Sequence, residues 1–207
     1  MSHISVLLHE TVDGVLAGRD TGIYVDATFG RGGHTKLLLS KLDQNARVYA
    51  FDKDPQALEV AAQLEQEDPR FKIIHASFAD MQQALNDLGV TQVDGLMADL
   101  GVSSPQLDQA ERGFSFMKDG PLDMRMDNSQ GPTAAEWLVD IEEEALANVI
   151  FQYGEERYSR RIAKAIKQAG ELTTTAQLAE LVKTAHPKWE KHKHPATRTF
   201  QAIRIAI

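Results

Sequence analysis

The sequence IYVDATFGRGGH at residues 23–34 joins a short apolar segment to a glycine-rich turn. Residues 23–27 are mostly β-branched, aromatic or small, as expected of a buried strand. Glycines follow at positions 30, 32 and 33, and leucines at 37, 38 and 42 then recur with helical spacing. A strand, a glycine turn and a helix in this order predict a βα unit whose turn can approach a ligand closely.

Outward from this stretch, apolar runs and helical patterns alternate along the first hundred residues. We expect further strands at residues 47–51, 71–75 and 93–98, and helices at 55–66 and 81–88. Alternation of this kind is typical of parallel sheets with crossover helices. The sequence therefore predicts an α/β fold with a doubly wound, mostly parallel sheet.

The rhythm changes after residue 100. Residues 101–131 form a long segment rich in Gly, Pro and Met, and long loops of this kind are usually functional or disordered. Residues 132–195 show helical patterns and no strand signal, with capping boxes at Thr133/Glu136 and Thr174/Gln177. We expect a core made of residues 1–131 and 196–207, and an inserted all-helical domain at 132–195.

Composition excludes several classes of protein. The 207 residues include no Cys, which excludes disulfide frameworks, thiolate zinc sites and iron–sulfur clusters and suits a reducing cytoplasm. No apolar run is long enough to cross a membrane. His186, His192 and His194 lack the spacing of a helical zinc motif, so we expect no metal.

Charge is distributed unevenly. The net charge is −8, but residues 1–150 hold 11 Lys and Arg against 25 Asp and Glu, whereas residues 151–207 hold 11 against 5. The negative net charge of the whole chain argues against a nucleic-acid partner, but the C-terminal segment taken alone is basic.

Polar and aromatic residues follow the predicted strands where a ligand of an open α/β sheet would lie. Asp52 comes 19 residues after Gly33, where a carboxylate can accept both ribose hydroxyls of an adenosine. Thr35 stands where a dinucleotide motif requires Gly or Ala, which favours a nucleoside such as S-adenosylmethionine over NAD.

We expect Gly32, Asp52, Phe78 and Asp99 to converge on one crevice. Purely structural roles stay open for the same residues. The glycines can serve only a tight turn, Phe78 can pack in the core, and Asp99 can be a turn or helix-capping residue.

Residues 155–169 combine an apolar helical face with a basic one. The pattern alone is equally typical of a solvated face. Together with later basic residues it predicts a surface that contacts RNA phosphates. The RNA-binding candidates are Arg157, Arg160, Arg161, Lys164, Lys167, Lys191, Lys193 and Arg198.

Several ordered motifs resemble the bacterial RsmH/MraW family, from about residue 3 to the end of the chain. They are DATFGRGGH at 26–34, DKDP at 52–55, DLGVSSPQL at 99–107, ERGFSFM at 111–117, GPLDMRMD at 120–127 and HPATRTF at 194–200. The resemblance implies an S-adenosylmethionine-dependent enzyme that methylates N4 of a cytosine in the decoding region of 16S rRNA. It also implies a Rossmann-like class I methyltransferase core with an inserted helical domain.

The resemblance further assigns site residues. The family's cofactor contacts fall on Gly32, Gly33, His34, Asp52, Phe78, Asp99 and Gln106. Family members continue beyond the equivalent of residue 207, so we expect this core to be incomplete at its C-terminal end. The implied partner is 16S rRNA in the small ribosomal subunit, in the cytoplasm. The oligomeric state stays open, with a homodimer as one option.

For catalysis, the neutral amine of cytosine needs a hydrogen-bond acceptor that draws electron density to its nitrogen. Asp99 is the first candidate and Asp123 the second. Phe114 or Phe116 is a candidate to stack on an extruded base, and the alternative is that they anchor the loop. Two other functions stay open: a methyltransferase for another amine substrate, and a truncated fragment that binds cofactor or RNA without activity.

Overall fold

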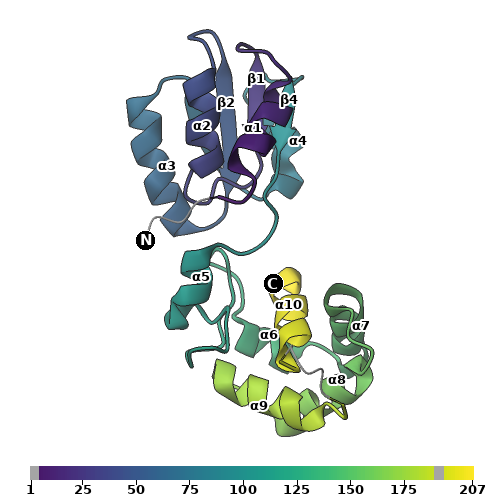
Figure 1. Ribbon diagram of the computed structural model, residues 1–207. Helices are drawn as coiled ribbons and strands as arrows, with labels where there is room; N and C mark the ends of the chain where they lie inside the picture. The colour runs from purple at the N-terminus through teal and green to yellow at the C-terminus, as the bar shows by residue number, and fades with distance from the viewer. Residues whose placement is uncertain (1–4, 189–193) are drawn as a thin grey trace. The chain divides into compact units, whose positions relative to one another are not determined.

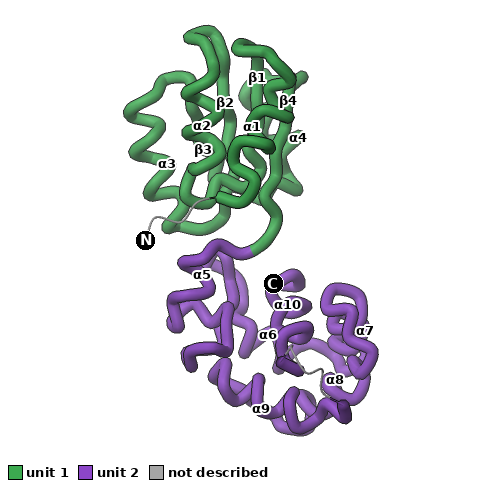
Figure 2. Tube along the Cα trace, viewed as in Figure 1, with its two compact units in different colours: residues 1–101 green, residues 102–207 purple. Residues whose placement is uncertain are grey.

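A computed structural model describes residues 5–188 and 194–207. The chain forms two compact units, Met1–Gly101 and Val102–Ile207 (Figure 2).

The first unit contains a parallel sheet of four strands in the order β3-β2-β1-β4 (Figure 1). Its strands are β1 (Ile23–Asp26), β2 (Arg47–Asp52), β3 (Phe71–His75) and β4 (Gly95–Met97). All four match predicted strands, although β4 is shorter than expected. The predicted α/β class with a Rossmann-like parallel sheet is confirmed.

Helices cover both faces of this sheet (Figure 1). The helical elements are α1 (Leu8–Leu16), α2 (Gly33–Lys41), α3 (Pro55–Glu67), η1 (Phe78–Asp80) and α4 (Met81–Asp87). One apolar cluster joins α1, α2 and α3 to the sheet, and another joins α4 to the opposite face. Tyr24 and Val25 of β1 point to opposite faces and are both fully buried, which explains the continuous apolar run of this central strand.

The second unit is helical. It contains α5 (Ser104–Asp108), η2 (Ala110–Arg112), α6 (Ala134–Asp140), α7 (Glu143–Gly154), α8 (Ser159–Ala169), α9 (Thr175–Ala185) and α10 (Ala196–Ala206). Both predicted capping boxes are present. A third one, at Ser103 and Gln106, was not predicted; Pro105 lies in the first turn of this helix, where proline is well tolerated.

The helix expected at 155–169 begins later, at Ser159. Glu155 adopts a left-handed conformation with φ of 53°, so α7 ends at Gly154 and the chain turns before α8. Ile162, Ala163 and Ile166 of α8 are buried in the core of the unit, as the amphipathic pattern predicted.

The second compact unit extends beyond residues 132–195 on both sides. Residues 102–131 and 196–207 pack with the helices of the second unit. They do so because they contribute side chains to the same hydrophobic core as α6 to α9. These side chains are Leu122 and Met124 of the long segment and Phe200 and Ile203 of α10. Gly154 lets α10 approach closely, since a Cβ there would lie 2.5 Å from the carbonyl oxygen of Arg198.

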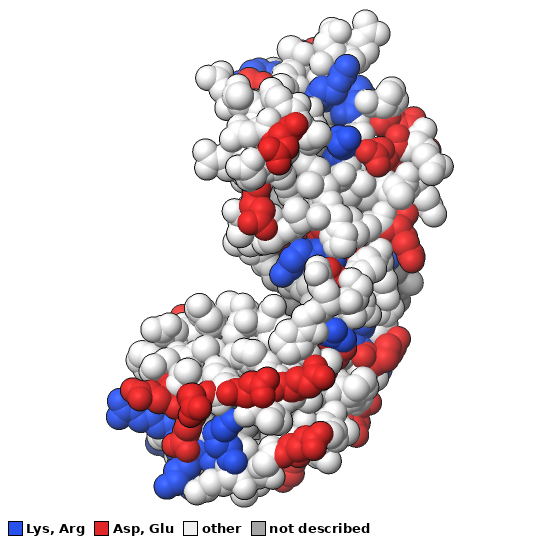
Figure 3. Space-filling view, turned by 180° about the vertical axis from the view of Figure 1, so that it is seen from behind, with Lys and Arg blue, Asp and Glu red and all other residues white. Residues whose placement is uncertain are grey.

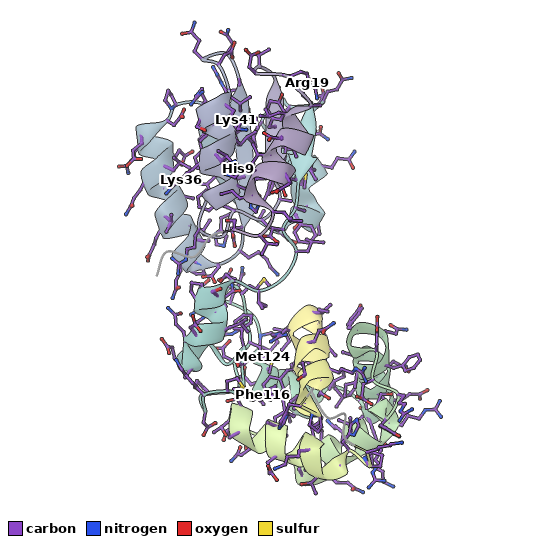
Figure 4. The ribbon with its side chains drawn as sticks, in the orientation of Figure 1. His9, Arg19, Lys36, Lys41, Phe116 and Met124 are labelled. Atoms are coloured by element: carbon purple, nitrogen blue, oxygen red, sulfur yellow. The ribbon has the colours of Figure 1, made fainter. Side chains whose placement is uncertain are left out.

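The long segment after α5 is held by specific contacts rather than left free. Arg112 donates to the carbonyl oxygen of Met126 at 2.9 Å, and Pro121 forms a bridge with Thr174. Phe114 is fully buried. Phe116, labelled in Figure 4, packs edge-on against Phe200, with ring centroids 4.9 Å apart. Both phenylalanines therefore anchor the segment in the core, as the alternative interpretation held.

Candidate functional site: the carboxyl edge of the sheet and a basic helix

The glycine turn after β1 is joined to Asp52 at the end of β2. Gly30 and Gly32 have φ of 57° and 74°, in the left-handed region that favours glycine. The backbone N–H of Gly30 donates to Oδ2 of Asp52 at 2.7 Å, and that of Asp54 donates to Oδ1 at 2.9 Å. The Asp52 carboxylate is thereby fixed in direction while half-buried, and its remaining lone pairs can accept hydroxyl groups.

A second group of hydrogen bonds joins the end of β1 to β4. The Asp26 carboxylate accepts from the hydroxyl of Thr35 at 2.6 Å and from the backbone N–H of Thr28 at 3.1 Å. The hydroxyl oxygen of Thr28 accepts the backbone N–H of Asp99 at 2.7 Å. Asp99 itself is exposed at the carboxyl edge of the sheet.

Asp26 is only 2% exposed. Burial raises the pKa of this carboxyl, and the hydrogen bonds from Thr35 and Thr28 oppose the rise. A buried carboxylate with a raised pKa at the carboxyl edge of an α/β sheet is, on general grounds, a candidate functional residue.

The other predicted contacts of the first unit lie at the same edge. Phe78 opens η1 directly after β3 and is 48% exposed, so it is not core. His34 is buried in the first turn of α2, with Nε2 3.2 Å from the carbonyl oxygen of Val6. Gly33 lies under the N-terminal segment, where a Cβ would come within 2.3 Å of Oγ of Ser5. The first unit thus brings Gly32, Gly33, His34, Asp52, Phe78 and Asp99 to one edge.

Gln106 and Asp123 belong to the second unit. Gln106 is buried, and its side chain closes the capping box with Ser103. Both oxygens of Asp123 are held by Arg125, at 2.8 and 2.7 Å. Desolvation raises the pKa of Asp123, but the Arg125 hydrogen bonds and charge outweigh it and leave the pKa lowered. Asp123 therefore serves as an ion-pair partner, and Asp99 is the more accessible acid.

The basic residues on and just before α8 divide into two groups. Arg157, Arg160, Arg161 and Lys164 are exposed and form what we call the basic face. The guanidinium of Arg157 lies over the ring of Tyr158, 4.6 Å from its centroid. Lys and Arg side chains gather at this end of the second unit, beside acidic ones (Figure 3).

Two other predicted RNA contacts have partners within the fold. Nζ of Lys167 donates to the carbonyl oxygens of Leu138 and Val139 at 3.0 and 2.7 Å. Arg198 lies 3.9 Å from the carboxylate of Glu156, which is almost fully buried. Lys191 and Lys193 lie outside the described residues.

Comparisons with known proteins bear on this site. Residues 1–207 match the MraW methylase family. The chain belongs to that family. It is 84% identical to a protein of Acinetobacter baylyi called ribosomal RNA small subunit methyltransferase H, covering all of this chain and 68% of that one. Its identity to proteins of the same name is 82% for Acinetobacter baumannii and 59% for a Psychrobacter species, covering 67% and 63% of them. The chain thus spans about two thirds of the length of these relatives.

Two solved structures also resemble parts of the chain. An rRNA methylase from Streptococcus thermophilus is 28% identical, with a TM-score of 0.32 over 40% of this chain and 50% of that one. A putative rRNA methylase from Clostridium thermocellum is 24% identical, with a TM-score of 0.34 over 40% and 48%.

Asp26, Thr28 and Thr35 were not among the predicted site residues, although hydrogen bonds join them to one another and to Asp99. Asp26 and Asp52 each end a strand and Asp99 comes two residues after β4, and this repeated position was the available signal. Thr28 and Thr35 carried no such signal, because their role depends on hydrogen bonds formed only in the folded chain.

The described residues form neither a long apolar helix nor a cluster of potential metal ligands. No helix there is long and apolar enough to cross a membrane. Among residues 5–188 and 194–207, no group of three or more His, Asp or Glu side chains is arranged to hold a metal ion.

Proposed function

We propose that this chain carries the cofactor site and an RNA-binding unit of an S-adenosylmethionine-dependent methyltransferase acting on N4 of a cytosine in the decoding region of 16S rRNA. The observation that carries the proposal is the fixed Asp52 carboxylate beside the glycine turn, in a chain of the MraW methylase family. The relatives' shared name, ribosomal RNA small subunit methyltransferase H, supports the substrate.

The residues at the carboxyl edge fit S-adenosylmethionine. Asp52 is oriented by two backbone N–H groups and can accept the ribose hydroxyls. Phe78 offers a half-exposed aromatic ring for the adenine. The turn at Gly32 leads into the N-terminus of α2, where backbone N–H groups favour a carboxylate. The bound cofactor would supply the methyl group.

Asp99 is the residue we assign to the reacting amine. The lone pair of the N4 amine is delocalised into the cytosine ring, so a nearby hydrogen-bond acceptor increases its nucleophilicity. Asp99 would accept a hydrogen bond from this amine and take up the proton lost after transfer. Its exposure leaves it accessible to a base, whereas Arg125 occupies Asp123.

The second unit would supply RNA contacts. We propose that the helices within residues 132–195 form the inserted domain and that the basic face binds RNA phosphates. Such a substrate also implies a cytoplasmic location.

The proposal is tested by incubating the chain with labelled S-adenosylmethionine and four acceptors: undermethylated small ribosomal subunits, naked 16S rRNA, DNA and a protein mixture. We expect label in small subunits or their rRNA, at N4 of one cytosine. Label only in DNA or protein would instead support the other-amine alternative. Binding of cofactor without transfer to any acceptor would support the inactive-fragment alternative.

Cofactor binding is tested separately by calorimetry. Asp52→Asn should weaken S-adenosylmethionine binding about tenfold or more, because two hydroxyl groups lose a charged acceptor. Asp87→Asn, an exposed position on α4, is the matched control and should bind like the wild type. Equal affinities for the wild type and Asp52→Asn would place the cofactor elsewhere.

A further inference from the structure

Thr28 holds a position that the strand register defines. Asp26 of β1 pairs with Met97 of β4, and the N–H of Ala27 donates to the carbonyl oxygen of Met97 at 2.9 Å. If the register is continued two residues past this pair along each strand, Thr28 lies opposite Asp99. Both strands have ended by this point, so no regular main-chain pairing orients Asp99.

The Thr28 side chain replaces that main-chain pairing. Its hydroxyl oxygen accepts the backbone N–H of Asp99 at 2.7 Å, within the range of a strong hydrogen bond. A carbonyl oxygen of a neighbouring strand would otherwise accept this N–H. The half-buried Thr28 side chain thus extends the pairing of β1 and β4 past its end.

Thr28 is itself held in place. Its backbone N–H donates to Oδ1 of Asp26 at 3.1 Å, and Oδ2 of the same carboxylate accepts from Thr35 in the first turn of α2. Asp26 is almost fully buried and has little freedom to move. A continuous series of hydrogen bonds therefore runs from α2 through Asp26 and Thr28 to Asp99.

We propose that Thr28 is a positioning residue for Asp99, acting through the hydrogen bond from the Asp99 backbone N–H to the Thr28 hydroxyl. The inference rests on the proposed function, in which Asp99 contacts the reacting amine. The hydroxyl fixes the backbone at the start of the segment after β4, and hence the position from which the Asp99 side chain projects. Since displacement of a reacting group by about 1 Å can cost about a hundredfold in rate, the hydrogen bond affects turnover without contacting substrate.

Two substitutions isolate the hydroxyl. Thr28→Val keeps the shape and removes the acceptor, whereas Thr28→Ser keeps the acceptor. Thr91→Val, at an exposed position before β4, is the control for loss of a Thr hydroxyl elsewhere. Turnover is measured at saturating S-adenosylmethionine and small subunits, cofactor Kd by calorimetry, and the Asp99 amide by NMR shift and hydrogen exchange.

We expect Thr28→Val to lower kcat about tenfold or more, with a smaller change in cofactor Kd, and to make the Asp99 amide exchange faster. Thr28→Ser should stay within about threefold of the wild type, as should Thr91→Val. Equal losses in the Ser and Val variants, or wild-type kcat in Thr28→Val, would overturn the inference.

The NMR measurement separates this inference from the proposed function. If the wild type transfers no methyl group to any acceptor, the proposed function fails. The NMR shift and exchange rate of the Asp99 amide then test on their own whether Thr28 positions Asp99. An Asp99 amide with the same shift and exchange rate in the wild type and in Thr28→Val would overturn the inference about Thr28. A changed amide in Thr28→Val, restored in Thr28→Ser, would support it.

Discussion

Asp26 is buried at the carboxyl edge of the sheet, where removing a carboxylate from water costs free energy. Its two oxygens accept hydrogen bonds from Thr35 and Thr28, and these recover part of the desolvation cost. Because the pKa in the folded chain is raised above its ordinary value of 3.8, the folded state binds the proton more tightly than the unfolded state. The contribution of Asp26 to stability is therefore full at low pH and is lost as the pH rises through the folded-state pKa.

We predict that Asp26→Asn alters how stability depends on pH. The free energy of unfolding of the variant, relative to the wild type, should rise as the pH increases above about 4, with a slope of up to about 1.4 kcal/mol per pH unit, and then level off. Urea unfolding at several pH values measures this difference. A difference that is independent of pH would contradict the prediction.

Asp68→Asn supplies a control of opposite sign. Hydrogen bonds from Arg70 lower the pKa of Asp68 in spite of desolvation, so its stabilising effect is present at neutral pH and is lost on acidification. The Asn variant should be less stable than the wild type at pH 7, and the gap should narrow as the pH falls toward the lowered pKa.

At the scale of elements, α6 is a helix of only seven residues with a specific contact at each end. Thr133 and Glu136 form a capping box at its N-terminus. At its C-terminus the ammonium group of Lys167, from α8, donates to the carbonyl oxygens of Leu138 and Val139. Cationic donors at a helix C-terminus satisfy free carbonyl groups and interact favourably with the helix dipole.

The two lysines of α8 should consequently behave differently. Lys167→Met should lower the free energy of unfolding by about 1 to 2 kcal/mol, because two carbonyl groups lose a charged donor. Lys164→Met, one turn earlier and exposed, should change stability by less than about 0.5 kcal/mol but weaken RNA binding. Urea unfolding and RNA titration of both variants test the contrast. If Lys167→Met weakens RNA binding at unchanged stability, Lys167 contacts RNA as the sequence predicted.

At the scale of the whole chain, charge is separated along the sequence. The first 150 residues carry a large acidic excess, and the last 57 carry 11 Lys and Arg against 5 Asp and Glu. Under the proposed function, cofactor binding and RNA binding therefore need not depend on the same charges. In the second unit, the basic face offers four exposed cations on or next to one helix.

We predict that Arg161→Glu weakens RNA binding and reduces its salt dependence while leaving S-adenosylmethionine affinity unchanged. For a single-stranded target, the slope of log K against log salt should fall in magnitude by about 0.7 for each lost phosphate contact. Lys72→Glu, an equal change of charge at an exposed position of β3, is the control. Similar RNA affinities for the two variants at every salt concentration would argue against the basic face.

Much of this protein was predictable from sequence because the patterns involved are local. The strands, the glycine turn, Asp52 and two capping boxes depend on side-chain period and on spacings of a few residues. Phe78 and Asp99 were predicted to lie at the carboxyl edge because each follows a strand within a few residues, and the structure places both there. The amphipathic face of α8 was likewise evident, although its first turn was placed too early.

The tertiary structure decided what depends on contacts between distant residues. The sequence could not tell that Asp26, Thr28 and Asp99 share hydrogen bonds, since residues 71 positions apart meet only when β1 and β4 pair. Nor could it tell that Lys167 caps α6 while Lys164 stays exposed, or that the apolar side chains of α10 pack against α7 and α9. Spacing along a chain specifies elements, but partners are chosen by burial and hydrogen bonding between elements.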